Sequence, residues 1–229
     1  MNYWTNPDHA LKYLARADSI PHRTEGEAAL LAELPLSARR ILDLGAGDGR
    51  LSALVRIERP QSKFILLDFS AIMLEKARNR FADDPHFTII AHDMVHPLPD
   101  LGTFDAIVSS FAIHHLEDVR KRTLYAELYA LLNPGGIFCN LEHVASVSAE
   151  RHDRFLKAIN YTRATEDTEN KLASIESQLV WLREAGFMEV DCHWKWLELA
   201  LIAGVKPKQV RSIRSRSTKG EKSKYNVKS

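Results

Sequence analysis

Short apolar runs alternate with amphipathic stretches along most of this chain. The runs predict strands at residues 40–44, 63–67, 87–91, 104–110 and 137–142. Between them, apolar residues recur every three or four positions, which is the period of a helix with one buried face. Because parallel strands are joined by crossover helices, this alternation predicts an α/β fold in which helices cover both faces of a parallel sheet.

Two further helices are expected before the first strand. Residues 7–17 form one, and residues 21–34 form the other, with Pro21 in its first turn and Ala28 on its buried side. Because both precede the sheet, they are an N-terminal helical addition to the core of the fold.

After the fifth predicted strand the pattern changes. Residues 144–170 are mostly polar and charged, and a helix then ends at Gly186, a residue suited to terminating it. Two final apolar runs, 187–194 and 196–203, predict two more strands, which brings the number of expected strands to seven.

The first strand leads into a glycine-rich turn. Residues 41–50 read ILDLGAGDGR, with glycines at three alternate positions and Asp43 near the end of the strand. Glycines let a backbone approach a ligand closely and adopt positive φ, so the turn predicts a site for a nucleoside cofactor. The G-x-G-x-x-G fingerprint of dinucleotide sites would need a glycine where Arg50 stands, which argues against an NAD-dependent oxidoreductase.

The order of motifs resembles that of the class I S-adenosylmethionine-dependent methyltransferases of the small-molecule type. Their first motif is an acid followed by G-x-G-x-G, and their later turn L-x-P-G-G is similar to residues 131–136 here. The resemblance covers roughly residues 40–205, with five motifs in sequence. It implies a Rossmann-like, doubly wound sheet of seven strands that is mostly parallel, with the final two runs as an antiparallel pair at its edge and hence an antiparallel edge strand. It also implies S-adenosylmethionine as cofactor.

The resemblance also implies which residues hold the cofactor. Asp68 ends the second strand about twenty residues beyond the glycine turn, where the family binds both ribose hydroxyls. Phe69 and Met73 would cover the adenine, while Asp93 would accept a hydrogen bond from its amino group and Met94 would add a backbone contact. The full set of expected cofactor residues is Asp43, Gly45, Ala46, Gly47, Gly49, Asp68, Phe69, Met73, Asp93, Met94 and Ser109.

Candidate catalytic groups lie at the ends of strands four and five. His114 and His115 follow the fourth strand, and a histidine is a suitable base if the acceptor must lose a proton; we prefer His114. Glu142 is a further catalytic candidate, and His143 and Arg23 are candidate substrate-binding residues, Arg23 through a carboxylate. The spacing of histidines and acids does not predict a metal site.

These implications divide the chain into an N-terminal helical lid (1–35), a methyltransferase domain (36–205) and a basic tail (206–229). Within the domain, residues 144–178 are expected to be an insertion on the substrate side. The tail has nine Lys or Arg against one Glu, a net charge of +8. Of the 31 basic and 30 acidic residues this leaves 22 and 29 for residues 1–205, a net charge of −7. The tail is therefore expected to be disordered.

The expected partner is a small-molecule acceptor. An acidic body disfavours nucleic acid, except through the tail, and no apolar run of membrane-spanning length is present. The chain starts without a secretory signal, and Cys139 and Cys192 lie in apolar strands, so we expect a cytoplasmic protein with free thiols; a homodimer is compatible with these features.

Other functions stay open at this stage. The chain lacks the Pro-Pro-aromatic element of the enzymes that methylate base amines. Residues 182–187 also look like part of the carboxy-S-adenosylmethionine synthase of tRNA modification, although the glycine turn and the histidine pair differ from it. A noncatalytic S-adenosylmethionine-binding protein is a further alternative. The sequence does not name the acceptor.

Overall fold

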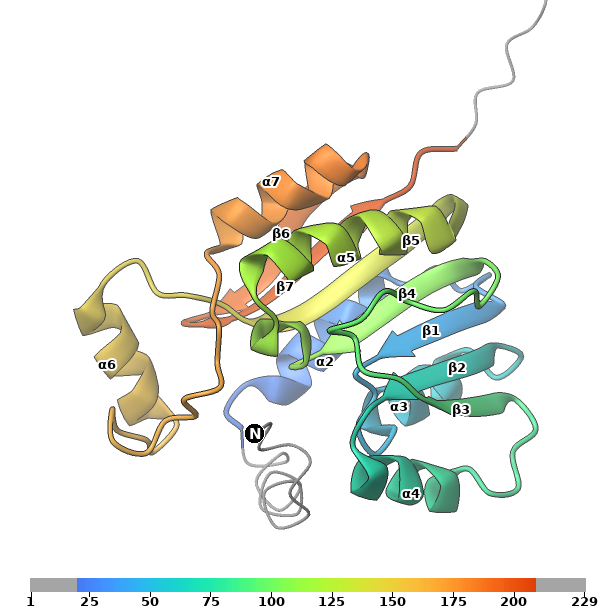
Figure 1. Ribbon diagram of the computed structural model, residues 1–229, viewed down its shortest axis with the longest axis horizontal. Helices are drawn as coiled ribbons and strands as arrows, with labels where there is room; N and C mark the ends of the chain where they lie inside the picture. The colour runs from blue at the N-terminus through green and yellow to red at the C-terminus, as the bar shows by residue number, and fades with distance from the viewer. Residues whose placement is uncertain (1–19, 209–229) are drawn as a thin grey trace, which may run out of the picture.

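The protein is built around one seven-stranded sheet, which the computed structural model shows within the described residues 20–208 (Figure 1). Its strand order is β3-β2-β1-β4-β5-β7-β6. The strands are β1 (Arg40–Leu44), β2 (Lys63–Asp68), β3 (Phe87–Ala91), β4 (Phe104–Ser110), β5 (Leu132–His143), β6 (Met188–Trp196) and β7 (Leu199–Val205).

The five strands β1 to β5 are parallel, as the alternating pattern predicts. The final pair lies at the edge, as expected; β7 runs antiparallel to both its neighbours and stands one place in from the edge strand β6. The chain moves outward from β1 to β3 and then returns to the other side of β1 as β4. This reversal opens a crevice beyond the carboxyl ends of β1 and β4, where ligands bind in doubly wound folds.

Helices cover both faces of the sheet (Figure 1). Apolar residues of α5 and α7 join one buried cluster, and those of α2, α3 and α4 join another. Neighbouring residues of β1 point to opposite faces, so Leu42 belongs to the first cluster and Ile41 to the second. The helices are α2 (Arg23–Glu33), α3 (Arg50–Glu58), α4 (Ala71–Arg80), α5 (Asp118–Leu131), α6 (Ala149–Ala158) and α7 (Ile175–Ala185), with a 3₁₀ turn η2 (Ile113–His115).

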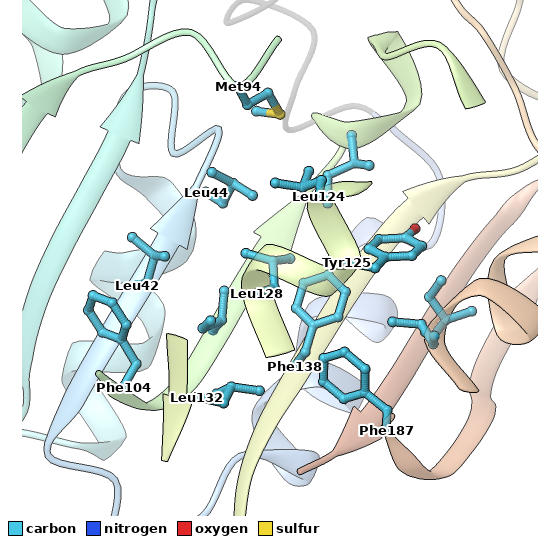
Figure 2. Packing of buried hydrophobic residues seen from close by; sticks show 14 of the residues in the cluster. Leu42, Leu44, Met94, Phe104, Leu124, Tyr125, Leu128, Leu132, Phe138 and Phe187 are labelled. Carbon is cyan, nitrogen blue, oxygen red and sulfur yellow. The ribbon is translucent and has the colours of Figure 1, made fainter. Parts of the chain in front are cut away.

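Figure 2 shows how the first cluster joins α5 to the sheet. Leu124 and Leu128 of α5 face Leu42 and Phe138 of the strands, and all four are fully buried. Truncating one such side chain to alanine costs about 2–5 kcal/mol, so this layer is a main source of stability. It also fixes η2, the turn after β4, because Ile113 lies in the same cluster.

The start of α2 differs from the expectation. The helix begins at Arg23, and Pro21 lies in the preceding turn rather than in its first turn. Ala28 is exposed, whereas Glu27 is buried. Glu27 can be buried in place of an apolar residue because two arginine side chains donate hydrogen bonds to its carboxylate, as described below. The predicted helix at 7–17 lies outside the described residues.

Two later segments also differ. The polar stretch 144–170 contains α6, whose N-cap Ser148 accepts a hydrogen bond from the backbone N–H of Arg151 and whose buried apolar residues are Phe155 and Leu156. Strand β5 starts at Leu132 rather than at residue 137, because its pairing with β4 continues across an irregularity.

The boundary before the predicted tail lies further along the chain than expected. Lys206 exchanges backbone hydrogen bonds with Gly135 and Gly136, and its ammonium donates to the carbonyls of Tyr129 and Leu132, each at 2.8 Å. Residues 206–208 therefore belong to the folded part, and residues 209–229 lie outside the described residues. Within residues 20–208, no helix has the length and apolar character needed to span a membrane.

Candidate functional site

The three glycines of the turn after β1 have different surroundings. Gly45 and Gly49 pack closely against neighbouring side chains, whereas Gly47 faces open space. Gly45 and Gly47 have φ values of 68° and 56°, which side-chain-bearing residues rarely adopt. A Cβ on Gly45 would lie 2.2 Å from that of Ala112, whereas a Cβ on Gly47 would meet only the sulfur of Met73, at 4.0 Å. The space in front of Gly47 is therefore available to a ligand.

Asp68 faces this turn from the end of β2. Its carboxylate accepts hydrogen bonds from the backbone N–H groups of Gly47 and Ser70, both at 2.8 Å. Burial raises the pKa of Asp68, although these N–H groups act in the opposite direction. A carboxylate oxygen can accept more than one hydrogen bond, so this pinned group retains capacity for a vicinal diol.

Asp43 lies beneath the turn at the end of β1. It is 1% exposed, and the hydroxyl of Ser52 donates to its carboxylate at 2.7 Å. Burial raises the pKa of Asp43 to about 7, against the effect of that hydrogen bond. Its charge at neutral pH therefore responds to what binds above it.

These groups line one pocket at the carboxyl ends of β1, β2 and β4, with a volume of about 920 Å³ that includes solvent at its mouth. Met94 lines this pocket and also belongs to the buried cluster that contains Leu44 (Figure 2). Nine expected cofactor residues line the pocket: Asp43, Gly45, Ala46, Gly47, Asp68, Phe69, Met73, Asp93 and Met94.

The other two expected cofactor residues do not line it. The hydroxyl of Ser109 donates to the Leu44 carbonyl at 2.7 Å, so it joins β4 to β1. Gly49 precedes α3 with a φ of 81°, and a Cβ there would lie 2.4 Å from Phe81. Both residues stabilise the frame of the site rather than its surface.

Two serines that the motifs do not single out line the pocket. The hydroxyls of Ser70 and Ser110 are buried and have no hydrogen-bond partner among the described residues. Buried hydroxyls are almost always satisfied, so these two point to a bound ligand. Ser110 directly follows the predicted Ser109; the alternation of a strand is the signal that could have separated them.

A cluster of two arginines and one glutamate forms another wall of the pocket. The guanidinium of Arg23 donates to Glu27 at 2.9 Å, and that of Arg50 donates to both oxygens of Glu27 at 2.9 and 3.1 Å. Burial raises the pKa of Glu27, but these hydrogen bonds outweigh it and leave the pKa lowered. Arg23 also lies 5.3 Å from the ring centre of Phe111. Guanidinium groups in a pocket wall suit a carboxylate ligand.

The histidine pair divides between the pocket and the interior. His115 lines the pocket, whereas His114, the preferred candidate, does not. Nδ1 of His114 lies 2.5 Å from the carboxylate of Glu142, and both side chains are buried. Burial lowers the pKa of His114 well below its usual value and raises that of Glu142 to about 7. The pair therefore keeps His114 neutral and fixed beneath His115, with ring centres 4.1 Å apart.

His143 does not line the pocket either. Its Nε2 lies 2.9 Å from Glu198, in a separate polar cluster beside α6. The structure thus brings Arg23 and His115 to the pocket and leaves His143 and Glu142 behind its wall. Within residues 20–208, no group of three or more His, Cys, Asp or Glu side chains is arranged to hold a metal ion.

The pocket fits S-adenosylmethionine. Asp68 offers acceptors for the ribose diol, Phe69 and Met73 offer apolar contacts for the adenine, and Asp93 adds a carboxylate that can accept from the exocyclic amine. The open space at Gly47 lets the ligand approach the backbone. The acidic side chains are compatible with the positive charges of the sulfonium and the amine.

Comparison with known proteins agrees with this geometry. A methyltransferase-domain family model matches residues 41–136. The chain is 41% identical over 110 residues to an uncharacterized methyltransferase of Mycobacterium tuberculosis, covering 48% of this chain and 53% of that protein. The chain thus spans about half the length of that curated relative.

A longer match extends over most of the fold. The chain is 32% identical over 197 residues to the demethylmenaquinone methyltransferase of Clavibacter sepedonicus, covering 79% of this chain and 78% of that protein. The solved structure of an O-methyltransferase family protein from Burkholderia thailandensis has a TM-score of 0.71 at 17% identity, covering 90% of this chain and 62% of that chain; this likeness shows the fold. With the motifs, the pocket and these matches in agreement, the chain belongs to the class I S-adenosylmethionine-dependent methyltransferase family.

Proposed function

We propose that the protein transfers a methyl group from S-adenosylmethionine to a small-molecule acceptor by in-line displacement. One observation carries this proposal: the Asp68 carboxylate, pinned by Gly47 and Ser70, shares a pocket with the open face of the glycine turn. A diol acceptor and a close backbone approach in one pocket are what an adenosyl cofactor requires.

When bound, S-adenosylmethionine supplies a methyl group already activated by its sulfonium. The protein then has to hold the acceptor in line and exclude water. Phe111, Ala112 and Leu116 supply apolar surface after β4, on the side of the pocket opposite Asp68's strand. The guanidinium groups of Arg23 and Arg50 suit the carboxylate of the cofactor or of an acidic acceptor.

His115 is the candidate base where the acceptor must lose a proton. It lines the pocket, and His114 and Glu142 fix the turn from behind. Burial first, and then the neighbouring His114, lower the pKa of His115 to about 3, so its imidazole is neutral at physiological pH but is a weaker base than an ordinary histidine. This replaces His114, the base that the sequence favours.

A direct test incubates the purified protein with methyl-deuterated S-adenosylmethionine and a metabolite extract. The expected result is an extract component that gains one methylene with ordinary cofactor and its deuterated counterpart with the labelled form. Calorimetry with S-adenosylhomocysteine measures cofactor binding separately. The Asp68→Ala variant serves as the matched loss-of-binding control.

The outcomes separate the alternatives. Tight cofactor binding without any methylated product across extracts would favour a noncatalytic binding protein. A carboxylated adenosyl product in place of a methylated acceptor would favour the carboxy-S-adenosylmethionine synthase alternative. Absence of cofactor binding would overturn the proposal.

The expected location of this activity is the cytoplasm. Cys139 and Cys192 are free thiols, and burial raises the pKa of both, so neither is poised to oxidise. Fractionation of cells that express a tagged chain tests this location.

A further inference from the structure

His152, on α6, bridges two carboxylates. Its Nδ1 lies 2.9 and 3.1 Å from the two oxygens of Glu198, and its Nε2 lies 2.8 Å from Glu166. Ionised carboxylates only accept hydrogen bonds, and a neutral imidazole has one N–H group. Both contacts are hydrogen bonds only when the ring carries two protons, so the bridge requires an imidazolium.

The bridge joins parts of the chain that are distant in sequence. Glu166 lies in the turn after α6, and Glu198 lies between β6 and β7 with 1% of its surface exposed. Glu198 also contacts Nε2 of His143, at 2.9 Å, and accepts a hydrogen bond from the hydroxyl of Ser146. The carboxylate of Glu198 is therefore the fixed anchor to which α6 attaches through His152.

A small apolar cluster supports the same attachment. Phe155 and Leu156 of α6 are buried with Leu199 of β7, and partly buried residues that include Trp194 and Trp196 of β6 pack against them. Figure 1 shows that extended connections join α6 to the rest of the chain. The ionic bridge therefore adds a polar contact to this apolar one and fixes how the helix is attached.

The segment that contains α6 returns to the pocket wall. The backbone N–H of Lys171 donates to the carbonyl of His114 at 2.9 Å, and Nδ1 of His115 lies 3.5 Å from the Glu169 carbonyl. Residues 148–170 are thus held at one end by the His152 bridge and border, at the other, the turn that brings His115 to the pocket.

We propose that His152 is a positioning residue whose double protonation holds residues 148–170 against the acceptor side of the pocket. The identification of this wall as the acceptor side rests on the proposed function, whereas the His152 bridge does not depend on it. Attachment of α6, and with it the wall behind His115, then depends on pH.

The direction of this dependence follows from the surroundings of His152. Burial lowers its pKa, but the hydrogen bonds with Glu198 and Glu166 outweigh burial and leave the pKa raised. A raised pKa means that the attachment is fully present below the ordinary histidine value of about 6.5 and is lost as pH rises through the raised value.

The other charged groups around the bridge do not reverse this direction. Arg163 pairs with Asp153 at 2.8 Å on the exposed side of α6, and the arginine stays charged throughout this range. Burial raises the pKa of Glu198, but hydrogen bonds from His143, Ser146 and His152 outweigh it and leave the pKa lowered, so Glu198 is ionised over the same range.

The test uses the full chain bound to S-adenosylhomocysteine. Nitrogen-15 NMR of the histidine rings should show His152 with both nitrogens protonated at pH 6.5 and a midpoint above that value. Hydrogen exchange, corrected for the intrinsic effect of pH, should become about tenfold faster in residues 149–158 as pH rises through that midpoint.

Three variants make the test specific. Glu166→Gln offers a neutral acceptor and should lower the His152 midpoint and move the exchange transition to lower pH with it. Asp153→Asn removes the exposed ion pair between α6 and Arg163, which follows that helix, and should leave the His152 midpoint and the exchange transition unchanged. His152→Lys, which stays cationic, should remove the transition.

A His152 ring with one proton at pH 6.5, or an exchange transition that Glu166→Gln does not move, overturns the proposal. Affinity for S-adenosylhomocysteine should stay within about twofold across these variants, because none of them lines the pocket. Failure of cofactor binding in the unmodified chain would instead count against the proposed function.

Discussion

Asp68 accepts a hydrogen bond at 2.8 Å from the backbone N–H of Gly47, a residue 21 positions earlier in the chain. The contact joins the end of β2 to the turn after β1. It holds the carboxylate where it faces the ligand and holds the peptide that the ligand approaches. Two motifs that are separate in sequence are therefore one unit in the structure.

Replacing Asp68 with alanine should weaken S-adenosylhomocysteine binding by at least about tenfold. Each charge-assisted hydrogen bond to the ribose contributes roughly 1.5–3 kcal/mol, and about 1.4 kcal/mol corresponds to tenfold in affinity. The affinity of Asp68→Asn, which retains an acceptor for the Gly47 N–H, should lie between those of the unmodified chain and Asp68→Ala. The exposed Asp83→Ala variant is the control. Unchanged calorimetric affinity in Asp68→Ala would contradict the assignment.

Alanine at Gly45 and at Gly47 should have different effects. Both changes place a side chain at positive φ, which costs about 1–2 kcal/mol. Only at Gly45 does the new Cβ collide with Ala112, so Gly45→Ala should lower the melting temperature by more than Gly47→Ala does. Gly47→Ala should fold and lose cofactor affinity. The idea fails if Gly47→Ala binds S-adenosylhomocysteine normally.

His115 should matter more for methyl transfer than His114. His115→Gln should reduce turnover by about 10²–10⁴-fold, the usual contribution of a general base, with cofactor affinity retained. His114→Gln should act less on turnover and more on stability, because it removes the imidazole from buried Glu142 and leaves that carboxylate with only the hydrogen bonds from Asn140 and from the His143 backbone. The exposed His96→Gln variant serves as the control.

The pH profile gives a second reading of the same assignment. With a pKa of about 3, His115 is unprotonated throughout the range from pH 5 to pH 8. Its contribution to the rate should therefore be flat there, instead of rising near 6.5 as for an unperturbed histidine. Equal loss of turnover in the His114 and His115 variants would show that the pair acts only as structure.

Local pattern was sufficient for the frame of this protein. The strands β1 to β4 and the glycine turn each depend on neighbouring residues, such as the apolar run that ends at Asp68, and all lie where the pattern predicts. The cofactor residues follow because the carboxyl ends of parallel strands meet at one edge.

The remaining features depend on contacts that a local pattern does not contain. The burial of Glu27 requires Arg50, a residue 23 positions away. The orientation of the histidine pair depends on two features of the preceding turn. Phe111 adopts a left-handed conformation with a φ of 52°, and Ile113 of η2 packs into the buried cluster. Helix α6 was missed because charged residues surround its few apolar ones, and ionic contacts help to hold it.

Stability should depend on pH through Asp43. Its pKa is about 7 in the folded protein, against an ordinary value of 3.8. The folded state therefore binds a proton that the unfolded state has released, so this contribution to the free energy of unfolding is present at low pH and is lost as pH rises through 7. Asp43→Asn should remove that loss, which denaturant titrations at pH 5 and pH 8 would show as a smaller difference between the two conditions. Exposed Asp83→Asn should behave as the unmodified chain does.

The same deprotonation of Asp43 adds negative charge to the cofactor pocket, so affinity for the cationic S-adenosylmethionine should increase from pH 5 to pH 8 more in the unmodified chain than in Asp43→Asn. Parallel pH dependence of both stability and affinity in the two proteins would show that Asp43 is already ionised beneath the turn.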